Sequence, residues 1–424
     1  MISWLLISFA VMLFLGVPIG FSRGLSAMGG IIFLHGGNLV TVAQRTFEGM
    51  NSWALLAIPL YTFAGYTMSK GGVSRNLMDF CYSVVGHLYG GLAHVNVFSS
   101  MVFAGISGSA VADTAGVSGM FMPQMVRKGY SKEFTVAVSA VSSTVGIIIP
   151  PSIPMVVIAG ICGISTGKMF LGGIVPGIII GLSQMILSYI FAKIEKVEKE
   201  PGHFTFKAFW DSFLKSWPAL LMPVIIIGTI TSGIVSPTEA GAIAVVYGLV
   251  VGGLVYRELT FKDIVFAFIE TVRVSCRIFV VIGAAKLFTV MLTTAGFDRW
   301  LTGVMLGISS NPTVILIMIM LLFFFVTMFM ESIAALTLFM PIVYPIAIGA
   351  GVDPIVLGVL VTVVIGIGLV TPPVGMCIYV ACDLMKIRVG STMKYVVPYI
   401  LGTVFCIALL LLFPILITAP GGLM

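Results

Sequence analysis

Two short segments, far apart in the chain, place a glycine four residues before a double proline. They are Gly146–Pro151 and Gly368–Pro373, and both lie inside long apolar runs. A proline has no N–H, and its ring clashes with the carbonyl four residues earlier, so each segment should interrupt a helix. The carbonyls expected to lose their donors are those of Gly146, Ile147, Gly368 and Leu369.

Carbonyls without donors cannot face lipid, where each unsatisfied group costs several kcal/mol. They must face protein, trapped water or a cation, and oxygen-only ligands suit Na⁺. Paired broken helices are typical of a transport site near the middle of the membrane. The alternative is a proline kink repaired by Ser, Thr and water. Because the break occurs twice at equivalent places, we favour the ion site.

One carboxylate precedes each break, in a segment rich in small and hydroxyl residues. Asp113 lies in Gly105–Gly116, and Glu331 lies in Thr327–Thr337. We expect both segments to be tips of re-entrant hairpins. A carboxylate at membrane depth is costly and indicates a functional site. The alternative is that it caps a helix at the hairpin tip. For Asp113 both interpretations stay open, and for Glu331 we favour contact with substrate or ion.

Membrane spans must position these groups. Of the 424 residues, 59% are hydrophobic and 9% are charged, whereas soluble domains carry about 25% charged residues. This composition excludes a soluble enzyme, a disordered protein and a nucleic-acid binder. Spans are expected near 3–21, 24–42, 52–69, 133–162, 168–192, 217–234, 239–256, 278–295, 354–382 and 395–417. The two hairpins are expected near 88–125 and 311–349.

The two halves of the chain resemble each other. Gly129, Gly146 and Pro150-Pro151 recur as Gly351, Gly368 and Pro372-Pro373, at a constant offset of 222 positions. Matches in the same order over such a distance indicate an internal duplication.

The basic residues indicate that the halves have opposite orientations. Arg127, Lys128 and Lys132 precede the first break, whereas no Lys or Arg occurs between Arg299 and Lys386. Because basic residues collect on the cytoplasmic side, the two equivalent loops should lie on opposite sides of the membrane.

We therefore predict an all-α polytopic membrane protein with two inverted repeats, each of about five spans and one hairpin. The first repeat covers 1–192 and the second covers 217–424. Residues 193–216 form a cytoplasmic linker with an interfacial helix, and both termini lie outside. The six cysteines and four histidines lack the spacing of a metal site or a disulfide frame, and no cofactor or enzymatic activity is expected.

Five ordered motifs resemble a known family. They are GISGSAVADTAG, TVGIIIPPSIPM, GIVSPTEAGA, MESIAALTLFMP and GLVTPPVG, and the likeness extends over essentially the whole chain. The family is the large membrane subunit of the tripartite ATP-independent periplasmic (TRAP) transporters. The resemblance implies Na⁺-driven uptake of an organic acid, such as a C4-dicarboxylate or sialic acid, across the bacterial inner membrane. It also implies an elevator fold of the ion-transporter superfamily. The implied partners are a small four-span membrane subunit and a periplasmic substrate-binding protein.

The resemblance also implies site residues, carried over position by position. The first Na⁺ site would use Ser107, Gly146, Ile149 and Pro151. The second would use Thr327, Gly368, Thr371 and Val374. Substrate would lie near Ser109, Asp113, Ser152 and Glu331. Many family members carry Asn at the position of Val364, so one polar partner of the second site is absent here.

Other functions make different demands on the sequence. A passive channel or facilitator for small anions needs a continuous polar lining, but the polar residues here concentrate at the two breaks. An intramembrane enzyme needs a nucleophile with a base, and the two carboxylates lie on different hairpins without a histidine. A subunit with no transport path needs no duplicated break.

Overall fold

The computed structural model describes residues 2–34, 39–197 and 205–421, and no β-strand occurs in these ranges. The elements up to the linker are α1 (Ile2–Phe14), α2 (Ile19–Gly29), α3 (Leu39–Met50), α4 (Ala57–Lys70), α5 (Val73–Val85), α6 (Gly91–Ser107), α7 (Ala110–Asp113), α8 (Gly119–Arg127), α9 (Lys132–Ser143), α10 (Ile153–Cys162) and α11 (Thr166–Ile194).

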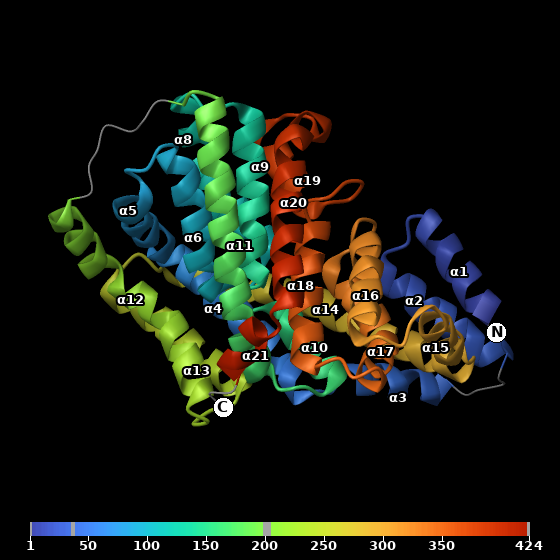
Figure 1. Cartoon of the computed structure of the whole chain (residues 1–424). Helices are drawn as coiled ribbons and strands as arrows, with labels where there is room; N and C mark the ends of the chain where they lie inside the picture. The colour runs from blue at the N-terminus through green and yellow to red at the C-terminus, as the bar shows by residue number, and fades with distance from the viewer. Residues whose placement is uncertain (1, 35–38, 198–204, 422–424) are drawn as a thin grey trace.

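The elements after the linker are α12 (Phe206–Thr231), α13 (Pro237–Val250), α14 (Phe261–Thr294), α15 (Phe297–Ile308), α16 (Pro312–Thr327), α17 (Ser332–Gly349), α18 (Pro354–Gly368), α19 (Met376–Met385), α20 (Val389–Leu412) and α21 (Ile415–Gly421). In Figure 1, α9, α11, α18 and α20 stand side by side at the centre, with α12 and α13 at one edge and α1 and α15 at the other.

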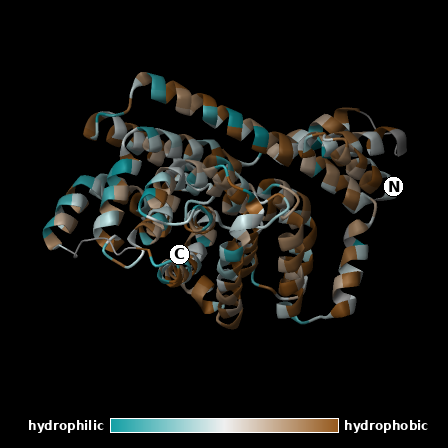
Figure 2. Ribbon diagram, turned by 90° about the horizontal axis from the view of Figure 1, so that it is seen from above, coloured by the Kyte–Doolittle hydropathy of each residue, from teal (hydrophilic) through white to brown (hydrophobic). Residues whose placement is uncertain are grey.

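Within the described ranges, five helices are long and apolar enough to cross a membrane, or six if one bent pair counts as a span. The five are Thr166–Ile194, Phe206–Thr231, Pro237–Val255, Ser332–Gly349 and Val389–Leu412. Much of the ribbon in Figure 2 is brown, which marks hydrophobic residues, and many large hydrophobic side chains are exposed; Phe14 is 93% exposed and Phe261 is 80% exposed. This surface fits contact with lipid rather than water.

Several expected spans differ from the helices in the structure. The span expected at 3–21 is two helices, α1 and α2, because the chain turns at Gly16 (φ 80°) and Pro18 caps α2. The span expected at 24–42 includes residues 35–38, which lie outside the described residues. The interfacial helix expected within 193–216 is not a separate element, since α12 begins at Phe206 and continues to Thr231. Residues 198–204 of that linker lie outside the described residues.

The two broken helices lie in the core. Every residue of α18 from Val356 to Gly368 is buried, as is every residue of α9 from Phe134 to Ser143. Each break packs against the other half of the chain: α19 packs against α9, and α10 packs against α17. The two candidate sites therefore belong to one interlocked core.

Positions that the duplication makes equivalent adopt matching backbone conformations. Gly129 and Gly351 both have φ 88°, and each lies shortly before a broken helix. This left-handed conformation favours glycine, which has no Cβ to clash with the backbone. Ser131 and Asp353, again 222 positions apart, are the N-caps of α9 and α18. The Pro150-Pro151 and Pro372-Pro373 bonds are both cis.

Candidate functional site

The first hairpin (α6 to α8) meets the first break (148–152) through a close backbone approach. Gly108 follows α6 with φ 62°, and the Ile153 N–H donates a hydrogen bond to the Gly108 carbonyl at 3.4 Å. A Cβ at Gly108 would lie 2.6 Å from the Pro151 carbonyl oxygen. Only glycine permits this distance, so the hairpin tip and the break are fitted to each other.

Asp113 lies behind this contact, 1% exposed. The Ser107 hydroxyl donates to its Oδ1 at 2.5 Å, while its Oδ2 has no hydrogen-bond partner among the described residues. A Cβ at Gly146 would collide with Oδ2, so the carboxylate rests directly on the Gly146 backbone. The structure thus brings together Ser107 and Gly146, which were predicted to share an ion site, and adds Asp113 to them.

The carbonyls of the first break are only partly free. None of the described groups donates a hydrogen bond to the carbonyls of Gly146, Ile149 or Pro151. The Ile147 carbonyl, which we expected to be unpaired, accepts a hydrogen bond from the Ser152 hydroxyl at 2.5 Å. Ser152 is also the N-cap of α10, accepting from the Met155 N–H at 3.3 Å. It therefore repairs part of the break.

The second hairpin (α16 and α17) meets the second break (369–375) in a similar way. The Val374 N–H donates to the Met328 carbonyl at 2.9 Å. Thr327 ends α16, and a Cβ at Gly368 would collide with its hydroxyl oxygen. Thr327 and Gly368 are thus in contact, as Asp113 and Gly146 are in the first half.

The prediction that the carbonyls of Gly368 and Leu369 lack donors was wrong. The Gly368 carbonyl accepts from the Thr371 N–H at 3.2 Å, and the Leu369 carbonyl accepts from the Cys377 N–H at 2.9 Å. The chain turns back after the prolines, so backbone donors beyond the break reach these oxygens. The carbonyls without a donor among the described groups include those of Thr371 and Val374. The Thr371 hydroxyl is itself used, donating to the Ile367 carbonyl at 2.7 Å.

Glu331 caps a helix, as its alternative interpretation proposed. It is the N-cap of α17, and its Oε2 accepts from the Ala334 N–H at 3.0 Å. Arg23 of α2, fully buried, donates to the Ala334 carbonyl at 2.6 Å and to the Thr337 hydroxyl at 3.0 Å. Arg23 also attracts the Glu331 carboxylate electrostatically. We did not predict this role of Arg23, although a single arginine within an apolar segment is unusual enough to suggest it.

A pocket of about 580 Å³ lies between the hairpin tips, the breaks and α14. The first hairpin contributes Ser109 and its neighbours, and the second contributes Glu331, Ser332 and Ile333. Of the four residues predicted to contact substrate, Ser109 and Glu331 line this pocket. Asp113 and Ser152 are buried at 1% exposure each and are not among its lining residues. The pocket also contains Arg277 of α14, which the sequence analysis missed.

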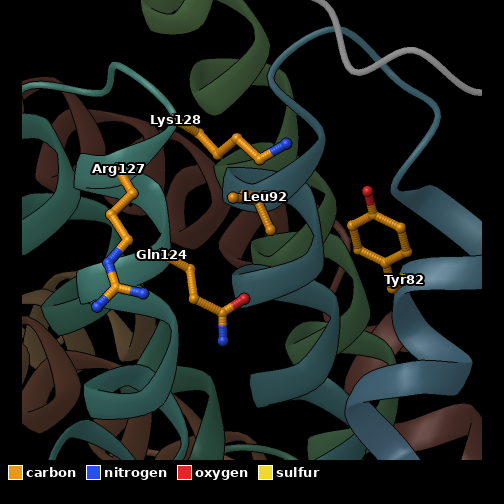
Figure 3. A pocket seen from close by; sticks show the side chains of 5 residues that line it. All are labelled: Tyr82, Leu92, Gln124, Arg127 and Lys128. Carbon is orange, nitrogen blue, oxygen red and sulfur yellow. The ribbon is translucent and has the colours of Figure 1, made fainter.

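A smaller pocket of about 290 Å³ lies elsewhere, near the end of α8. Figure 3 shows its lining residues: Lys128 extends toward Leu92, Arg127 and Gln124 lie beside it, and Tyr82 lies farther away. No residue predicted for ion or substrate binding lines it. The larger pocket is therefore the candidate substrate site.

Comparisons with known proteins agree over nearly the whole chain. A family model described as "Tripartite ATP-independent periplasmic transporter, DctM component" matches residues 6–416. The chain is 33% identical over 406 residues to a sialic acid TRAP transporter large permease protein of Vibrio cholerae, covering 95% of the chain and 94% of that protein. It is 35% identical over 397 residues to a C4-dicarboxylate TRAP transporter large permease protein of Pseudomonas aeruginosa, covering 94% and 91%.

A third relative is longer than this chain. The chain is 36% identical over 392 residues to an isethionate TRAP transporter permease protein of Oleidesulfovibrio alaskensis, covering 92% of the chain but only 62% of that protein.

Two solved transporters share the fold at low identity. The YdaH transporter of Alcanivorax borkumensis has a TM-score of 0.66 at 14% identity, covering 88% of each chain. The MtrF efflux pump of Neisseria gonorrhoeae has a TM-score of 0.62 at 15% identity, covering 88% and 84%.

Proposed function

Because the chain belongs to the DctM component family of the tripartite ATP-independent periplasmic transporters, we propose that it is the large permease of a Na⁺-coupled importer of an organic acid. Its relatives are transporter permeases, so the chain is a multi-pass membrane transport protein and not an enzyme. The coupling ion, the mechanism and the partners are parts of the proposal.

One observation carries the proposal: the same kind of contact is made twice, once in each half. In each half a glycine four residues before the double proline touches an oxygen-bearing side chain of a hairpin, Asp113 on Gly146 and Thr327 on Gly368. Within five or six residues of each glycine, the chain also has carbonyl oxygens without a described donor. A structural kink needs neither the duplication nor unused oxygens, whereas two cation sites need both.

The first site offers more oxygen ligands to a cation than the second, and one of them is a carboxylate. Its free carbonyls at Gly146, Ile149 and Pro151 are joined by the unpartnered Oδ2 of Asp113 and by the Ser107 hydroxyl. The second site offers the carbonyls of Thr371 and Val374 beside Thr327 and Gly368, without a carboxylate.

Na⁺ bound at both sites would hold each hairpin tip against its break. The pocket between the tips would then be ordered for substrate, so that substrate binds well only to the Na⁺-loaded state. We propose that the broken helices and hairpins form the moving part of an elevator, built from two inverted repeats, and that the remaining helices form its scaffold.

The setting of the protein follows from the same family. We propose that it lies in the bacterial inner membrane with both termini periplasmic, that a small four-span membrane subunit accompanies it, and that a periplasmic binding protein delivers the substrate. Its relatives are named for sialic acid, C4-dicarboxylates and isethionate, which are all organic acids. The substrate class proposed for this chain is therefore a small organic acid.

Uptake into proteoliposomes tests this proposal. The chain would be reconstituted with its small subunit, and radiolabelled succinate, sialic acid or isethionate would be supplied with the binding protein. We expect accumulation above the external concentration when an inward Na⁺ gradient is present and none when choline replaces Na⁺. Undiminished uptake in choline would remove the coupling. Equilibration without accumulation would instead support a passive facilitator.

A further inference from the structure

Helix α14 places an arginine inside the candidate substrate pocket. Its pocket-lining residues are Glu270, Val274, Arg277, Ile278 and Val281. Their spacing of three or four residues puts them on one face of the helix. Arg277 is near the midpoint of this 34-residue helix, which is about 50 Å long and exceeds the thickness of a bilayer core. We propose that Arg277 binds a carboxylate or sulfonate group of the transported acid, which deepens the proposed function and rests on it.

The other charged groups of this pocket already have partners. Glu270 forms an ion pair with Arg273, one turn away on α14. Glu331 caps α17 and attracts the buried Arg23. Among the described residues, Arg277 forms no ion pair and no hydrogen bond, although it lines the pocket. The pocket therefore presents one cation whose charge is not used within the protein.

An anion in this pocket has few other sources of positive charge. The N-terminus of α17, which could attract an anion, is occupied by the Glu331 carboxylate. The remaining walls are apolar or carry a hydroxyl, such as Ile147, Leu369 and Ser332. An arginine fork can donate two parallel hydrogen bonds to a carboxylate, which a hydroxyl cannot do.

Arg277 lines the same pocket as the hairpin tips. Tyr66 of α4 lines the same pocket and interacts electrostatically with both Arg277 and Glu270. Ser109 of the first hairpin and Glu331 of the second also line this pocket. A substrate that fills this pocket would touch both the hairpin tips and Arg277. Arg277 would thus help to select acids from neutral solutes.

The experiment compares Arg277→Gln, Arg277→Lys and Lys262→Gln in the complete reconstituted complex. Lys262 is the matched control because it is an exposed cation on the same helix and outside the pocket. The probes are succinate, sialic acid and isethionate, each supplied with the binding protein under an inward Na⁺ gradient. Uptake rate and the midpoint of thermal unfolding are measured for every variant.

We expect Arg277→Gln to lower the uptake rate about 10- to 100-fold, the effect of losing hydrogen bonds to a charged group. Arg277→Lys should recover part of the rate, and Lys262→Gln should match the wild type. The unfolding midpoint should stay unchanged in all three, because an exposed side chain is replaced.

Three results would overturn the inference, each in a different way. If Arg277→Gln takes up every probe at the wild-type rate, Arg277 does not bind substrate, and the proposed function stands. If the wild type accumulates none of the three probes, the organic-acid function fails and the role of Arg277 fails with it. A lower uptake rate of Arg277→Gln together with a lower unfolding midpoint would also overturn the inference, since Arg277 would then be structural.

Discussion

Gly146 and Gly368 occupy equivalent places before the two breaks, and each lies against a different oxygen. In the first half the oxygen belongs to the carboxylate of Asp113, and in the second it belongs to the hydroxyl of Thr327. The two contacts therefore differ in charge, and also in position, because Asp113 follows the first hairpin tip whereas Thr327 precedes the second. A cation at the first site would gain a full negative charge, whereas one at the second would meet only dipoles.

The role of Gly368 in this contact can be tested by adding one methyl group. In Gly368→Ala the new Cβ would collide with the Thr327 hydroxyl, so either α16 or the break must shift. Uptake should fall at least tenfold, because displacing a positioning group by a fraction of an ångström costs that much or more. The matched control is Gly366→Ala on the same helix, whose Cβ would meet Thr144 at an ordinary 3.4 Å. Equal uptake by the two variants would contradict the role of this contact.

Asp113 can be tested by removing its charge while keeping its shape. Asp113→Asn retains an oxygen for the Ser107 hydroxyl but removes the negative charge beside the free carbonyls. We expect the Na⁺ concentration that gives half-maximal uptake to rise about tenfold or more, since hydrogen bonds and contacts to charged groups are worth about 1.5–3 kcal/mol. Asp79→Asn removes an exposed carboxylate in the same half and should leave the Na⁺ dependence unchanged. An unaltered Na⁺ dependence in Asp113→Asn would exclude Asp113 from the site.

At the scale of elements, each break is held by a small number of specific hydrogen bonds. Ser152 both caps α10 and donates to the Ile147 carbonyl, so one hydroxyl serves both sides of the first break. The second break has no such residue; the backbone N–H groups of Thr371 and Cys377 serve instead. The two breaks are thus similar in place and different in how they are stabilised.

Ser152→Ala should therefore destabilise the fold. It leaves a buried carbonyl without its donor and removes an N-cap, and each loss costs about 1–2 kcal/mol. The free energy of unfolding in detergent would be measured by denaturant titration. Ser165→Ala is the control, since Ser165 caps α11 at an exposed end and serves only the Lys168 N–H. A loss of stability no larger than that of Ser165→Ala would show that the Ile147 carbonyl finds another donor.

The helices are interrupted at the two double prolines where the sequence predicted, because proline acts on its immediate neighbours. That the helix pairs before them are re-entrant hairpins stays a prediction. The sequence also singled out Gly146 and Gly368 as cation ligands, a role that stays a prediction; their contacts with hairpin side chains were not predicted. It could not predict which carbonyls stay free, since the Cys377 N–H reaches Leu369 only through the path of the chain after Pro373. That path depends on packing between distant helices, which local rules do not describe.

Contacts between distant segments could not be predicted from the sequence either. Arg23 binds the Ala334 carbonyl more than 300 residues away, and Arg277 lines a pocket formed by both hairpins. Nothing in the spacing of either arginine identifies its partners. The division of the first expected span into α1 and α2 could have been predicted, because Gly16 and Pro18 interrupt the apolar run. The span expected at 3–21 rests on hydropathy alone, which does not register a turn.

At the scale of the whole molecule, the two halves are interlocked rather than side by side. α19 of the second half packs on α9 of the first, and α10 packs on α17. The two breaks consequently share one core. α2 and α14 contact the outside of this core, through Arg23 and through the pocket wall. These helices are candidates for the stationary part of the proposed elevator.

The proposed inversion of the halves predicts where two equivalent loops lie. Lys132 begins α9, and Gly349 ends α17 just before α18, so both lie beside the loop that precedes a broken helix. Both are exposed, and a Cβ at Gly349 would meet no atom within 4 Å, so cysteine should be tolerated at either position. Because basic residues surround only the first loop, it should be cytoplasmic and the second periplasmic. An impermeant maleimide applied to spheroplasts should therefore label Gly349→Cys and not Lys132→Cys.

The labelling experiment needs a protein without exposed native cysteines and a control cysteine whose side of the membrane is also predicted. The exposed native Cys276 would be replaced by serine in every variant, and Lys193→Cys would report the end of α11, next to the linker that is predicted to be cytoplasmic. Lys132→Cys and Lys193→Cys should react only after the membrane is permeabilised, whereas Gly349→Cys should react at once. If Lys132→Cys and Gly349→Cys react from the same side, the halves are parallel. The two breaks would then approach the membrane centre from one side, and a pair of inverted ion sites would not exist.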